Sequence, residues 1–301
     1  MSKTVTVLMG GFSAEREVSL SSGKACADAL ENAGYAVTRL DVTRDIPALM
    51  AALDPRPDVV FNALHGRWGE DGAIQSLLDM MAIPYTHSGR LTSAVAMDKP
   101  LSVQLFRDAG LPTAQHIVCE IDDLRSQPDP MPRPFVVKPA HEGSSVGVYI
   151  VQEGTNGPDY ANWAYGTAMV EEYVPGLELT VGVMGGKAMA VTELRVTKGF
   201  YDYDAKYTDG ITEHLCPAPI PDSLTDACKD IAERAHVALG CRGVSRSDFR
   251  YDPETGRLII LEVNTQPGMT PLSLVPEQAR HLGMRFEELV SWMVENATCD
   301  P

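Results

Sequence analysis

The amino-acid sequence predicts a mixed α/β protein that begins with a parallel sheet and continues with antiparallel hairpins, so that it is α+β overall. In the first ninety residues, β-rich segments alternate with segments of helical periodicity, the order that builds a parallel sheet covered by helices. Further on, two pairs of β-rich segments flank Gly185-Gly186 and the turn sequence DPETG, which are hairpin signals.

The N-terminal elements follow from this alternation. Strands are expected at residues 4–9, 35–42 and 58–64, and a helix at 17–33 that stops at Gly34. In such a sheet the ligand crevice lies at the carboxyl ends of the strands. Two glycine-bearing loops, GGFSAERE and HGRWGEDG, leave strands at that end and are the expected lining of the crevice.

Two further units follow along the chain. A helix at 100–109, a hairpin around residue 143 and a strand at 168–174 form the second. Strands at 178–184, 187–196, 244–251 and 257–263, with amphipathic helices at 223–239 and 285–296, form the third. This organisation predicts three domains, at residues 1–92, 93–175 and 176–301.

Composition excludes several classes of function. The 301 residues carry a net charge of −16, so the surface as a whole repels nucleic acid and anionic membranes, and any contact with phosphate must be local. No signal peptide and no stretch of about 18 apolar residues is evident, so we expect a cytoplasmic protein. Six scattered cysteines without CxxC spacing indicate ordinary thiols.

The segment KPAHEGSSVG, residues 138–147, combines a lysine with a flexible Gly/Ser loop. It is not a P-loop, because the lysine precedes the glycines and a second strand follows them. It therefore predicts a hairpin whose tip folds over a ligand. Lysines are usually exposed and serve solubility. This interpretation is acceptable for Lys99 but weaker for Lys138, because the segment PFVVKP places Lys138 in an apolar strand.

The last hairpin suggests a metal site. Glu262 and Asn264 share one face of a strand, and the turn places Asp248 opposite or diagonal to Glu262. Carboxylate and amide oxygens suit Mg²⁺. The alternative is a solvated polar face, although LIILEVN indicates a buried strand. Arg246 shares the face of Asp248, either as its ion-pair partner or as a cation for a developing negative charge.

Other polar residues allow two interpretations each. Glu15 is a helix-dipole partner or a ligand, and His65 is a loop hydrogen-bonder tied to Glu70 or part of the site. Glu171 and Glu178 bracket a segment, EEYVPG, that is an ordinary charged linker or a nucleotide contact. Residues 198–211 have aromatic and acidic residues without periodicity, which favours a lid over a disordered segment.

Taken together, these segments resemble the D-alanine–D-alanine ligases of the ATP-grasp superfamily. The matching text is GGFSAEREVSLSSG, ALHGRWGEDGAIQ, MDK at 97–99, VVKPAHEGSSVGV, YDYDAKY, SRSDF and LEVNTQPGMTPLSLVP, from residue 10 to about 276. The resemblance implies an ATP-grasp architecture: an N-terminal parallel α/β domain that binds amino acids, and two α+β domains that enclose ATP between antiparallel sheets.

The resemblance also implies roles for individual residues. ATP would contact Lys99, Lys138, Ser144, Glu171, Glu172, Val174, Glu178 and Lys206, while Asp248, Glu262 and Asn264 would hold Mg²⁺. Two Mg²⁺ ions are expected, with Mn²⁺ as a substitute. The amino acids would contact Glu15, His65, Ser273 and Leu274. Catalysis would involve Glu15, Ser144, Tyr207, Arg246 and Gly268, with Ser144, Tyr207 and Glu15 in one hydrogen-bonded bridge.

The implied reaction joins two D-alanine molecules through an acyl phosphate and releases ADP and phosphate, for peptidoglycan precursor synthesis. Two residues depart from the family pattern: Trp68, where a small residue is common, and Gln266, where serine is common. The competing hypotheses are a ligase that uses D-lactate or D-serine as acceptor, a nucleotide-binding protein without catalysis, and a dinucleotide oxidoreductase. The last lacks G-x-G-x-x-G spacing. A homodimer is the expected assembly.

Overall fold

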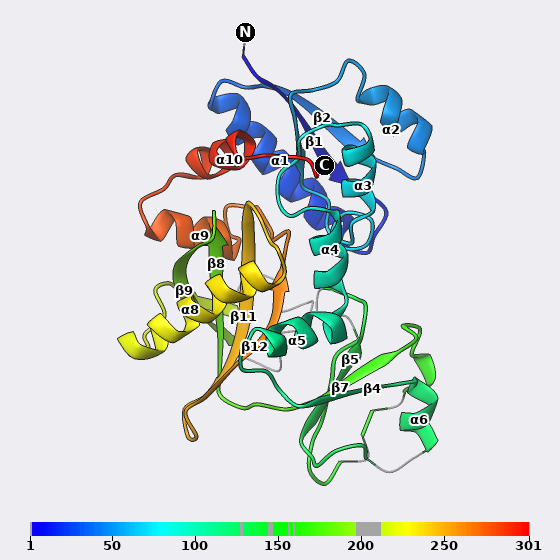
Figure 1. The fold of residues 1–301 in the computed structure, drawn as a ribbon, viewed down its shortest axis with the longest axis vertical. Coiled ribbons are helices and arrows are strands. Elements are labelled where there is room, and N and C mark those ends of the chain that lie inside the picture. Colours follow the sequence, from blue (N-terminus) through cyan, green and yellow to red (C-terminus); the bar gives the residue numbers. More distant parts are fainter. Residues whose placement is uncertain are drawn as a thin grey trace.

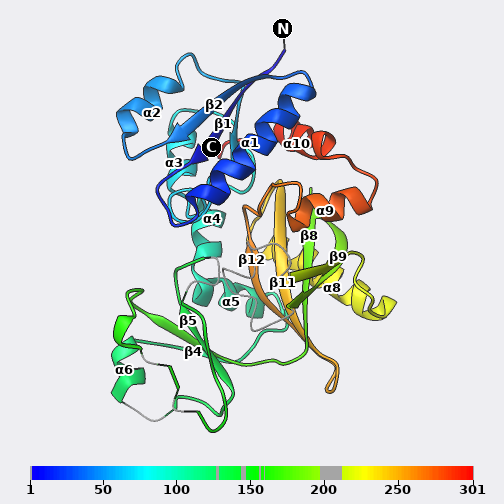
Figure 2. The same cartoon turned by 180° about the vertical axis from the view of Figure 1, so that it is seen from behind.

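The fold was analysed in a computed structural model, which describes residues 2–126, 129–143, 147–155, 157–158, 160–196 and 212–300. Three sheets follow one another along the molecule (Figure 1). The N-terminal sheet lies at one end, a four-stranded sheet lies at the other, and a five-stranded sheet lies between them. Figure 2 shows the same order from behind.

The N-terminal sheet is parallel, as predicted, with strand order β2-β1-β3. Its strands are β1 (Thr4–Gly10), β2 (Ala36–Val42) and β3 (Val59–Asn62), and its helices are α1 (Arg16–Asn32), α2 (Ile46–Ala52) and α3 (Ala73–Met80). Both faces are covered: Val5 and Val7 pack in the core that includes α1, whereas Leu8 packs in the core that includes α2 and α3. Burial on both faces is typical of a parallel sheet.

The second sheet is antiparallel and has the order β4-β7-β5-β6. It consists of β4 (His116–Cys119), β5 (Phe135–Pro139), β6 (Tyr149–Val151) and β7 (Ala168–Glu172), with α6 (Ile121–Ser126) and the 3₁₀ helix η1 (Tyr160–Asn162) beside it. Phe135 pairs with Val151, which confirms the hairpin predicted after Lys138. The tip of this hairpin, residues 144–146, lies outside the described residues.

The third sheet is also antiparallel, with the order β10-β9-β8-β11-β12. Its strands are β8 (Leu177–Met184), β9 (Lys187–Val196), β10 (Thr212–Leu215), β11 (Val244–Asp252) and β12 (Arg257–Asn264). A core of apolar side chains joins it to α5 (Lys99–Asp108) and α8 (Asp222–Ala238). The two hairpins predicted around Gly185-Gly186 and DPETG are both present.

The C-terminal helices connect this sheet to the N-terminal one. α9 (Leu274–His281) packs on β8 and β9, and α10 (Phe286–Glu295) packs on α1. α4 (Arg90–Met97) leads from the first sheet towards α5. Beyond α10 the chain returns to the N-terminal unit, where Thr298 pairs with Tyr85 and Asp300 N–H donates to Asp79 Oδ1 at 2.8 Å.

All six cysteines are free thiols, as expected. Within the described part of the chain, the longest apolar helical stretch is too short for a bilayer crossing. The predicted domain limits at residues 92 and 175 stay a prediction.

Candidate active site

A cleft lies between the two antiparallel sheets and contains about 840 Å³ of space, part of it open to solvent. Strands β5 and β7 supply one wall, and β11 and β12 supply the other. The segment Tyr173-Val174 runs along it. Two sheets that face each other across a narrow space are suited to a flat, partly apolar ligand.

Lys138 lies in the wall of this cleft and is buried, with 7% of its surface exposed. Its Nζ is 2.6 Å from Glu171 Oε1, and Glu171 is equally buried on the adjacent strand β7. The interpretation of Lys138 as an exposed solubilising lysine is therefore wrong. A buried lysine needs such a partner, and the pair presents a fixed cation to the cleft.

Lys99 approaches the same wall from the first turn of α5. Its backbone N–H donates to Ala140 O at 3.1 Å, and its Nζ donates to the carbonyl of Glu142. Both acceptors belong to the segment that follows β5. Lys99 therefore lies beside Lys138 at the base of the predicted phosphate-covering hairpin, and both side chains line the cleft.

The predicted metal-binding residues lie on the opposite wall. Asp248 pairs directly with Glu262, and Arg246 pairs with Asn264, across the β11–β12 hairpin. Directly paired side chains lie about 5 Å apart at Cβ, so both carboxylates can reach one cation. Arg246 forms a bidentate ion pair with Asp248, with Nε to Oδ1 at 2.8 Å and Nη2 to Oδ2 at 2.7 Å.

The charge of the cleft favours a divalent cation in it. Among its lining residues, six carboxylates face three cations, which are Lys99, Lys138 and Arg250. An anionic triphosphate in such a cleft needs additional positive charge. Two opposed carboxylates and an amide oxygen are donors that Mg²⁺ accepts. Among the described residues, no group of three or more His, Cys, Asp or Glu side chains could hold a metal ion, so the predicted site depends on the amide oxygen of Asn264 beside the two carboxylates.

Two arginines that were not predicted from the sequence hold the EEYVPG segment and the neighbouring Glu178. Arg250 Nε donates to Val174 O at 3.0 Å, and its Nη1 lies 3.4 Å from Glu178 Oε2. Arg257 forms a bidentate pair with Glu172, with one distance of 2.8 Å. The signal for Arg250 was present, because it continues the same-face series Arg246, Asp248, Arg250 along β11.

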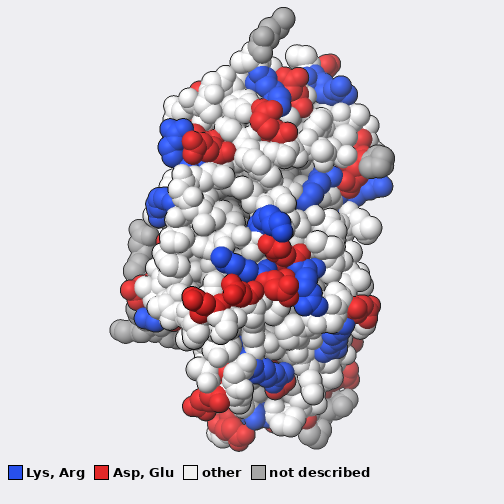
Figure 3. Space-filling view, turned by 60° about the vertical axis from the view of Figure 1, so that its left-hand side comes forward, with Lys and Arg blue, Asp and Glu red and all other residues white. Residues whose placement is uncertain are grey.

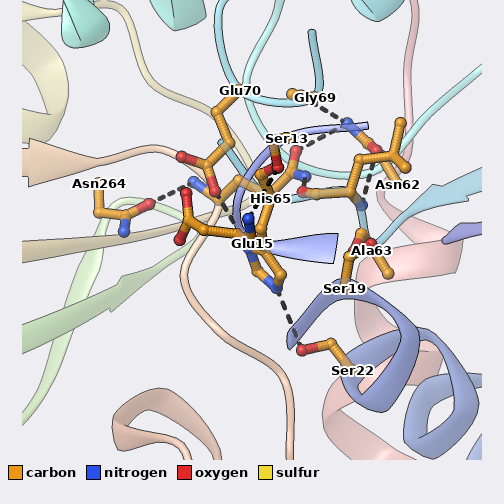
Figure 4. A network of polar contacts seen from close by, with 12 residues as sticks. Ser13, Glu15, Ser19, Ser22, Asn62, Ala63, His65, Gly69, Glu70 and Asn264 are labelled. Atoms are coloured by element: carbon orange, nitrogen blue, oxygen red, sulfur yellow. Dashed lines mark hydrogen bonds and ion pairs between the residues drawn. The ribbon is translucent and has the colours of Figure 1, made fainter. Parts of the chain in front are cut away.

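A network of buried polar side chains, referred to below as the polar pocket, lies where β1 and β3 end (Figure 4). Glu15, the residue before α1, is buried beside the loop that carries His65. His65 Nδ1 lies 3.0 Å from Glu70 Oε1, and its Nε2 lies 3.1 Å from Ser22 Oγ. The predicted tie between His65 and Glu70 is thus confirmed.

The electrostatics of this pocket centre on Glu70. Burial raises the pKa of Glu70, and the nearby carboxylate of Glu15 raises it further, whereas its hydrogen bond with His65 acts in the opposite direction. Two carboxylates close together in a buried pocket attract an ammonium group. Glu70 was recognised from the sequence only as a partner of His65, not as a member of the pocket.

The loop after β12 connects the two sites. Gln266 is buried and accepts from Asn62 Nδ2 at 2.7 Å, while its own amide donates to Leu64 O. Its backbone N–H donates to Asn264 Oδ1 at 2.9 Å. Gln266, one of the two departures from the family pattern, therefore joins the end of β12 to the end of β3. Trp68, the other departure, is half-exposed at φ 75° and lies 5.6 Å from the Phe12 ring.

The predicted acceptor residues form a compact turn at the start of α9. Ser273 Oγ accepts from Thr270 N at 3.0 Å and lies 2.8 Å from Thr270 Oγ1. A Cβ on Gly268 would lie 3.0 Å from Ser273 Oγ, so the backbone passes close to that hydroxyl. The expected residues Ser144, Lys206 and Tyr207, and the expected lid at 198–211, lie outside the described residues.

The face of the molecule in Figure 3 shows no large region of one charge. Basic and acidic side chains lie next to one another across the middle of that face. This agrees with the expectation that phosphate is bound by local cations rather than by a basic surface.

Two antiparallel sheets around a charged cleft, with a parallel sheet and its own polar pocket alongside, define an ATP-grasp enzyme. Family models agree: "D-ala D-ala ligase C-terminus" matches residues 105–295, and "D-ala D-ala ligase N-terminus" matches residues 47–88. The chain belongs to the D-alanine–D-alanine ligase family.

Individual relatives cover the whole chain. The D-alanine–D-alanine ligase of Acidiphilium cryptum is 58% identical over 300 residues, 99% of each chain, and that of Rhodospirillum rubrum is 58% identical over 304 residues, 100% of each. A Bacillus anthracis D-alanine–D-alanine ligase solved with ATP has a TM-score of 0.81 at 29% identity, covering 98% of this chain and 97% of that one.

A VanG D-Ala:D-Ser ligase from Enterococcus faecalis has a TM-score of 0.80 at 26% identity, covering 98% and 99%. Together the comparisons confirm the predicted ATP-grasp fold and the predicted ligase class. They therefore favour a ligase over the two competing hypotheses, a dinucleotide oxidoreductase and a nucleotide-binding protein without catalysis.

Proposed function

We propose that this chain joins two D-alanine molecules into D-alanyl-D-alanine and converts ATP to ADP and phosphate. The observation that carries the proposal is full-length identity of 58% to relatives named D-alanine–D-alanine ligases, combined with the cleft between the antiparallel sheets. The VanG D-Ala:D-Ser ligase is similar in fold but only 26% identical, so D-alanine is favoured as the acceptor.

ATP binds in the cleft as a substrate. Its adenine lies against the Glu171 to Val174 segment and its ribose against Glu178, where Arg250 fixes the carboxylate and the Val174 carbonyl. Lys99 and Lys138, which line the same cleft, contact the phosphates. Because Glu171 already holds Lys138, the ammonium needs no large rearrangement to meet a phosphate.

Asp248, Glu262 and Asn264 hold Mg²⁺. When bound, the cation offsets the charge of the triphosphate and polarises the γ-phosphoryl group. Two ions are proposed, with Mn²⁺ as a substitute. The excess of carboxylates over cations in the cleft supports this requirement.

The first D-alanine binds in the polar pocket, with its ammonium at Glu15 and His65 nearby. Its carboxylate attacks the γ-phosphorus and displaces ADP, which gives an acyl phosphate. The second D-alanine, held by Ser273 and Leu274, attacks the acyl carbon as a free amine. Phosphate leaves, and the amine proton is lost.

The chain stabilises the charge that develops in the second step. Arg246 and the backbone N–H of Gly268 face the oxyanion of the tetrahedral intermediate. The bidentate pair with Asp248 fixes the plane of the Arg246 guanidinium before substrate arrives. The proposal also includes Ser144 and Tyr207, which form a hydrogen-bonded bridge with Glu15. Lys206 contacts the γ-phosphate. Residues 198–211 close over the intermediate and exclude water.

Product identification tests this function. The purified chain is supplied with ATP, Mg²⁺ and, in turn, D-alanine, L-alanine, D-serine with D-alanine, or D-lactate with D-alanine. We expect phosphate release and D-alanyl-D-alanine with D-alanine alone, and little mixed product. If the mixed product exceeds the dipeptide, the acceptor is D-serine or D-lactate rather than D-alanine. If none of the amino acids causes phosphate release, the chain is not a ligase of this class.

The product would serve peptidoglycan precursor synthesis in the cytoplasm. The location and the homodimer stay predictions. Gel filtration with light scattering measures the assembly directly.

A further inference from the structure

Gln278 of α9 occupies an irregularity in the five-stranded sheet. The β8–β9 register shifts between Val181 and Val183, with Gly182 at the shift. Gln278 is completely buried there, and its Oε1 accepts from Gly182 N–H at 2.7 Å. Its Nε2 donates to Thr180 O at 3.2 Å and to Thr192 Oγ1 at 3.1 Å. The amide thus bonds to the strand backbone where the β8–β9 ladder is interrupted.

Glycine is needed at position 182 for this contact. A Cβ there would lie 2.9 Å from Gln278 Oε1 and 3.0 Å from Met189 Sδ. A side chain at this position would require the Gln278 amide or the Met189 side chain to shift. The shift in register, the glycine and the glutamine therefore form one structural unit.

This unit lies directly beside two residues of the proposed reaction. On β11, Arg246 pairs with Gly182 and Asp248 pairs with Thr180. The Thr180 hydroxyl also donates to Asp248 Oδ1 at 2.8 Å. Gln278 consequently fixes the backbone of the same residue whose side chain holds Asp248.

The hydrogen bonds of Asp248 leave a defined site for a cation. A carboxylate has about four lone-pair sites. Thr180 Oγ1 and Arg246 Nε occupy two on Oδ1, and Arg246 Nη2 occupies one on Oδ2. Without the Thr180 hydroxyl, Arg246 alone holds the carboxylate, so the position of the oxygen that would bind the cation is less firmly fixed.

The same helix carries the proposed acceptor contacts. α9 begins at Leu274, and Gln278 lies one turn further along the helix. One short helix thus carries the proposed acceptor contact Leu274 and also contacts the backbone behind Asp248.

We infer that Thr180 and Gln278 are positioning residues for the proposed metal-binding carboxylate Asp248, and that Gln278 ties that carboxylate to the acceptor-binding helix. The inference rests on the proposed function of Asp248. A positioning role differs from a purely structural role in its consequence: loss of the Thr180 hydroxyl must weaken metal binding and not only folding.

The test measures how much Mn²⁺ increases the affinity of the folded chain for ADP, by equilibrium dialysis with and without the metal. Thr180→Val keeps the shape of the side chain and removes its hydroxyl. We expect this variant to lose about tenfold of the Mn²⁺-dependent gain, with unchanged affinity for ADP alone. Thr180→Ser, which restores a hydroxyl, should recover the gain.

Ser247→Ala is the matched control. Ser247 adjoins Asp248 on β11, is completely buried, and its Oγ has no hydrogen-bond partner within the described part of the chain. Its Mn²⁺-dependent gain should equal that of the wild type. An unchanged gain in Thr180→Val, or an equal loss in Ser247→Ala, would overturn the inference.

Gln278→Met tests the second part. It should reduce the Mn²⁺-dependent gain and raise the KM for the acceptor D-alanine. Its effect on the gain should not add to that of Thr180→Val, because both act through Asp248. Additive losses would remove Gln278 from the inference, and the Thr180 variants decide alone if Gln278→Met does not fold. The binding measurement needs no turnover, so it remains decisive even if the acceptor is not D-alanine.

Discussion

At the scale of single residues, His87 shows how folding selects a protonation state. Its backbone is left-handed at φ 70°, and its ring is buried with its centroid 6.1 Å from that of Phe61. Gly243 lies close, since a Cβ there would be 3.4 Å from the His87 backbone. Burial lowers the pKa of His87 to about 3, so the folded chain holds a neutral imidazole.

This lowered pKa predicts a dependence of stability on pH. The pKa of an unfolded histidine is about 6.5, so above that pH neither state binds the proton. Between about 6.5 and 3 only the unfolded chain binds it, and the free energy of unfolding falls by about 1.4 kcal/mol per pH unit from this residue. His87→Asn, which tolerates a positive φ, should remove that part of the slope.

Urea unfolding at several values between pH 4 and pH 7 measures both slopes. The variant is first checked for native circular dichroism at pH 8, where His87 contributes no charge in either state. Equal slopes for the variant and the wild type would show that folding does not exclude the proton from His87.

Individual site residues differed in how far the sequence could predict them. Lys138 was expected to be buried because apolar residues precede it, and it is. The opposition of Asp248 and Glu262 followed from the length of one hairpin. Gln278 had no such signal, because its partner Gly182 lies 96 residues away and only the tertiary fold brings them together.

At the scale of elements, the loop after β3 supports the amino-acid pocket through a glycine. Gly66 has φ 71°, and a Cβ there would lie 2.7 Å from Glu15 Oε2 and 3.1 Å from Ser13 Oγ. Ser13 Oγ in turn donates to His65 O at 2.7 Å. The two loops therefore pack against each other at the point where a side chain has no room.

Gly66→Ala should disturb the pocket more than backbone strain alone explains. The left-handed conformation costs about 1–2 kcal/mol for alanine, and the added Cβ must also displace Glu15. Gly256→Ala is the matched control, since Gly256 has φ 72° and nothing within 4 Å of its Cβ position. We expect similar losses of stability from strain but a rise of about tenfold or more in the KM for the first D-alanine only in Gly66→Ala.

Steady-state kinetics and thermal unfolding of both variants make the comparison. If the two variants showed the same KM for D-alanine, Gly66 would serve only the turn, and the proposed position of Glu15 in the site would lose its support.

Long, strongly patterned elements were predicted well from the sequence, and two short edge strands with little burial were not. The helix expected at 17–33 is α1 at Arg16–Asn32, and the strand expected at 187–196 is β9. β4 and β10 were not predicted, because each has four residues at the edge of a sheet and little burial to impose a pattern. α9, which carries the inferred positioning residue Gln278, was also not predicted.

At the scale of the whole molecule, the C-terminal part of the chain completes the N-terminal unit. α10 packs on α1, and Arg242 joins the two parts by donating to His87 O at 3.1 Å and to Thr298 O at 2.7 Å. Division of the sequence into consecutive domains could not predict this return, because the contact of Arg242 with His87 links residues 155 positions apart.

Charge also acts at this scale. The chain carries −16 overall, yet its proposed substrate is a triphosphate. Lys99 and Lys138 supply local cations in the cleft, but carboxylates outnumber cations among its lining residues, so a triphosphate there needs further positive charge. The account therefore depends on one central claim, that ATP reacts in this cleft with a D-alanine carboxylate.

Isotope transfer tests that claim most directly. D-Alanine labelled with ¹⁸O in both carboxylate oxygens is incubated with the purified chain, ATP and Mg²⁺, and the released phosphate is examined by mass spectrometry. Because the carboxylate oxygen becomes the bridge of the acyl phosphate, each phosphate released with a dipeptide should carry one ¹⁸O. Dipeptide formed with unlabelled phosphate, or with the label in AMP, would contradict the acyl-phosphate account.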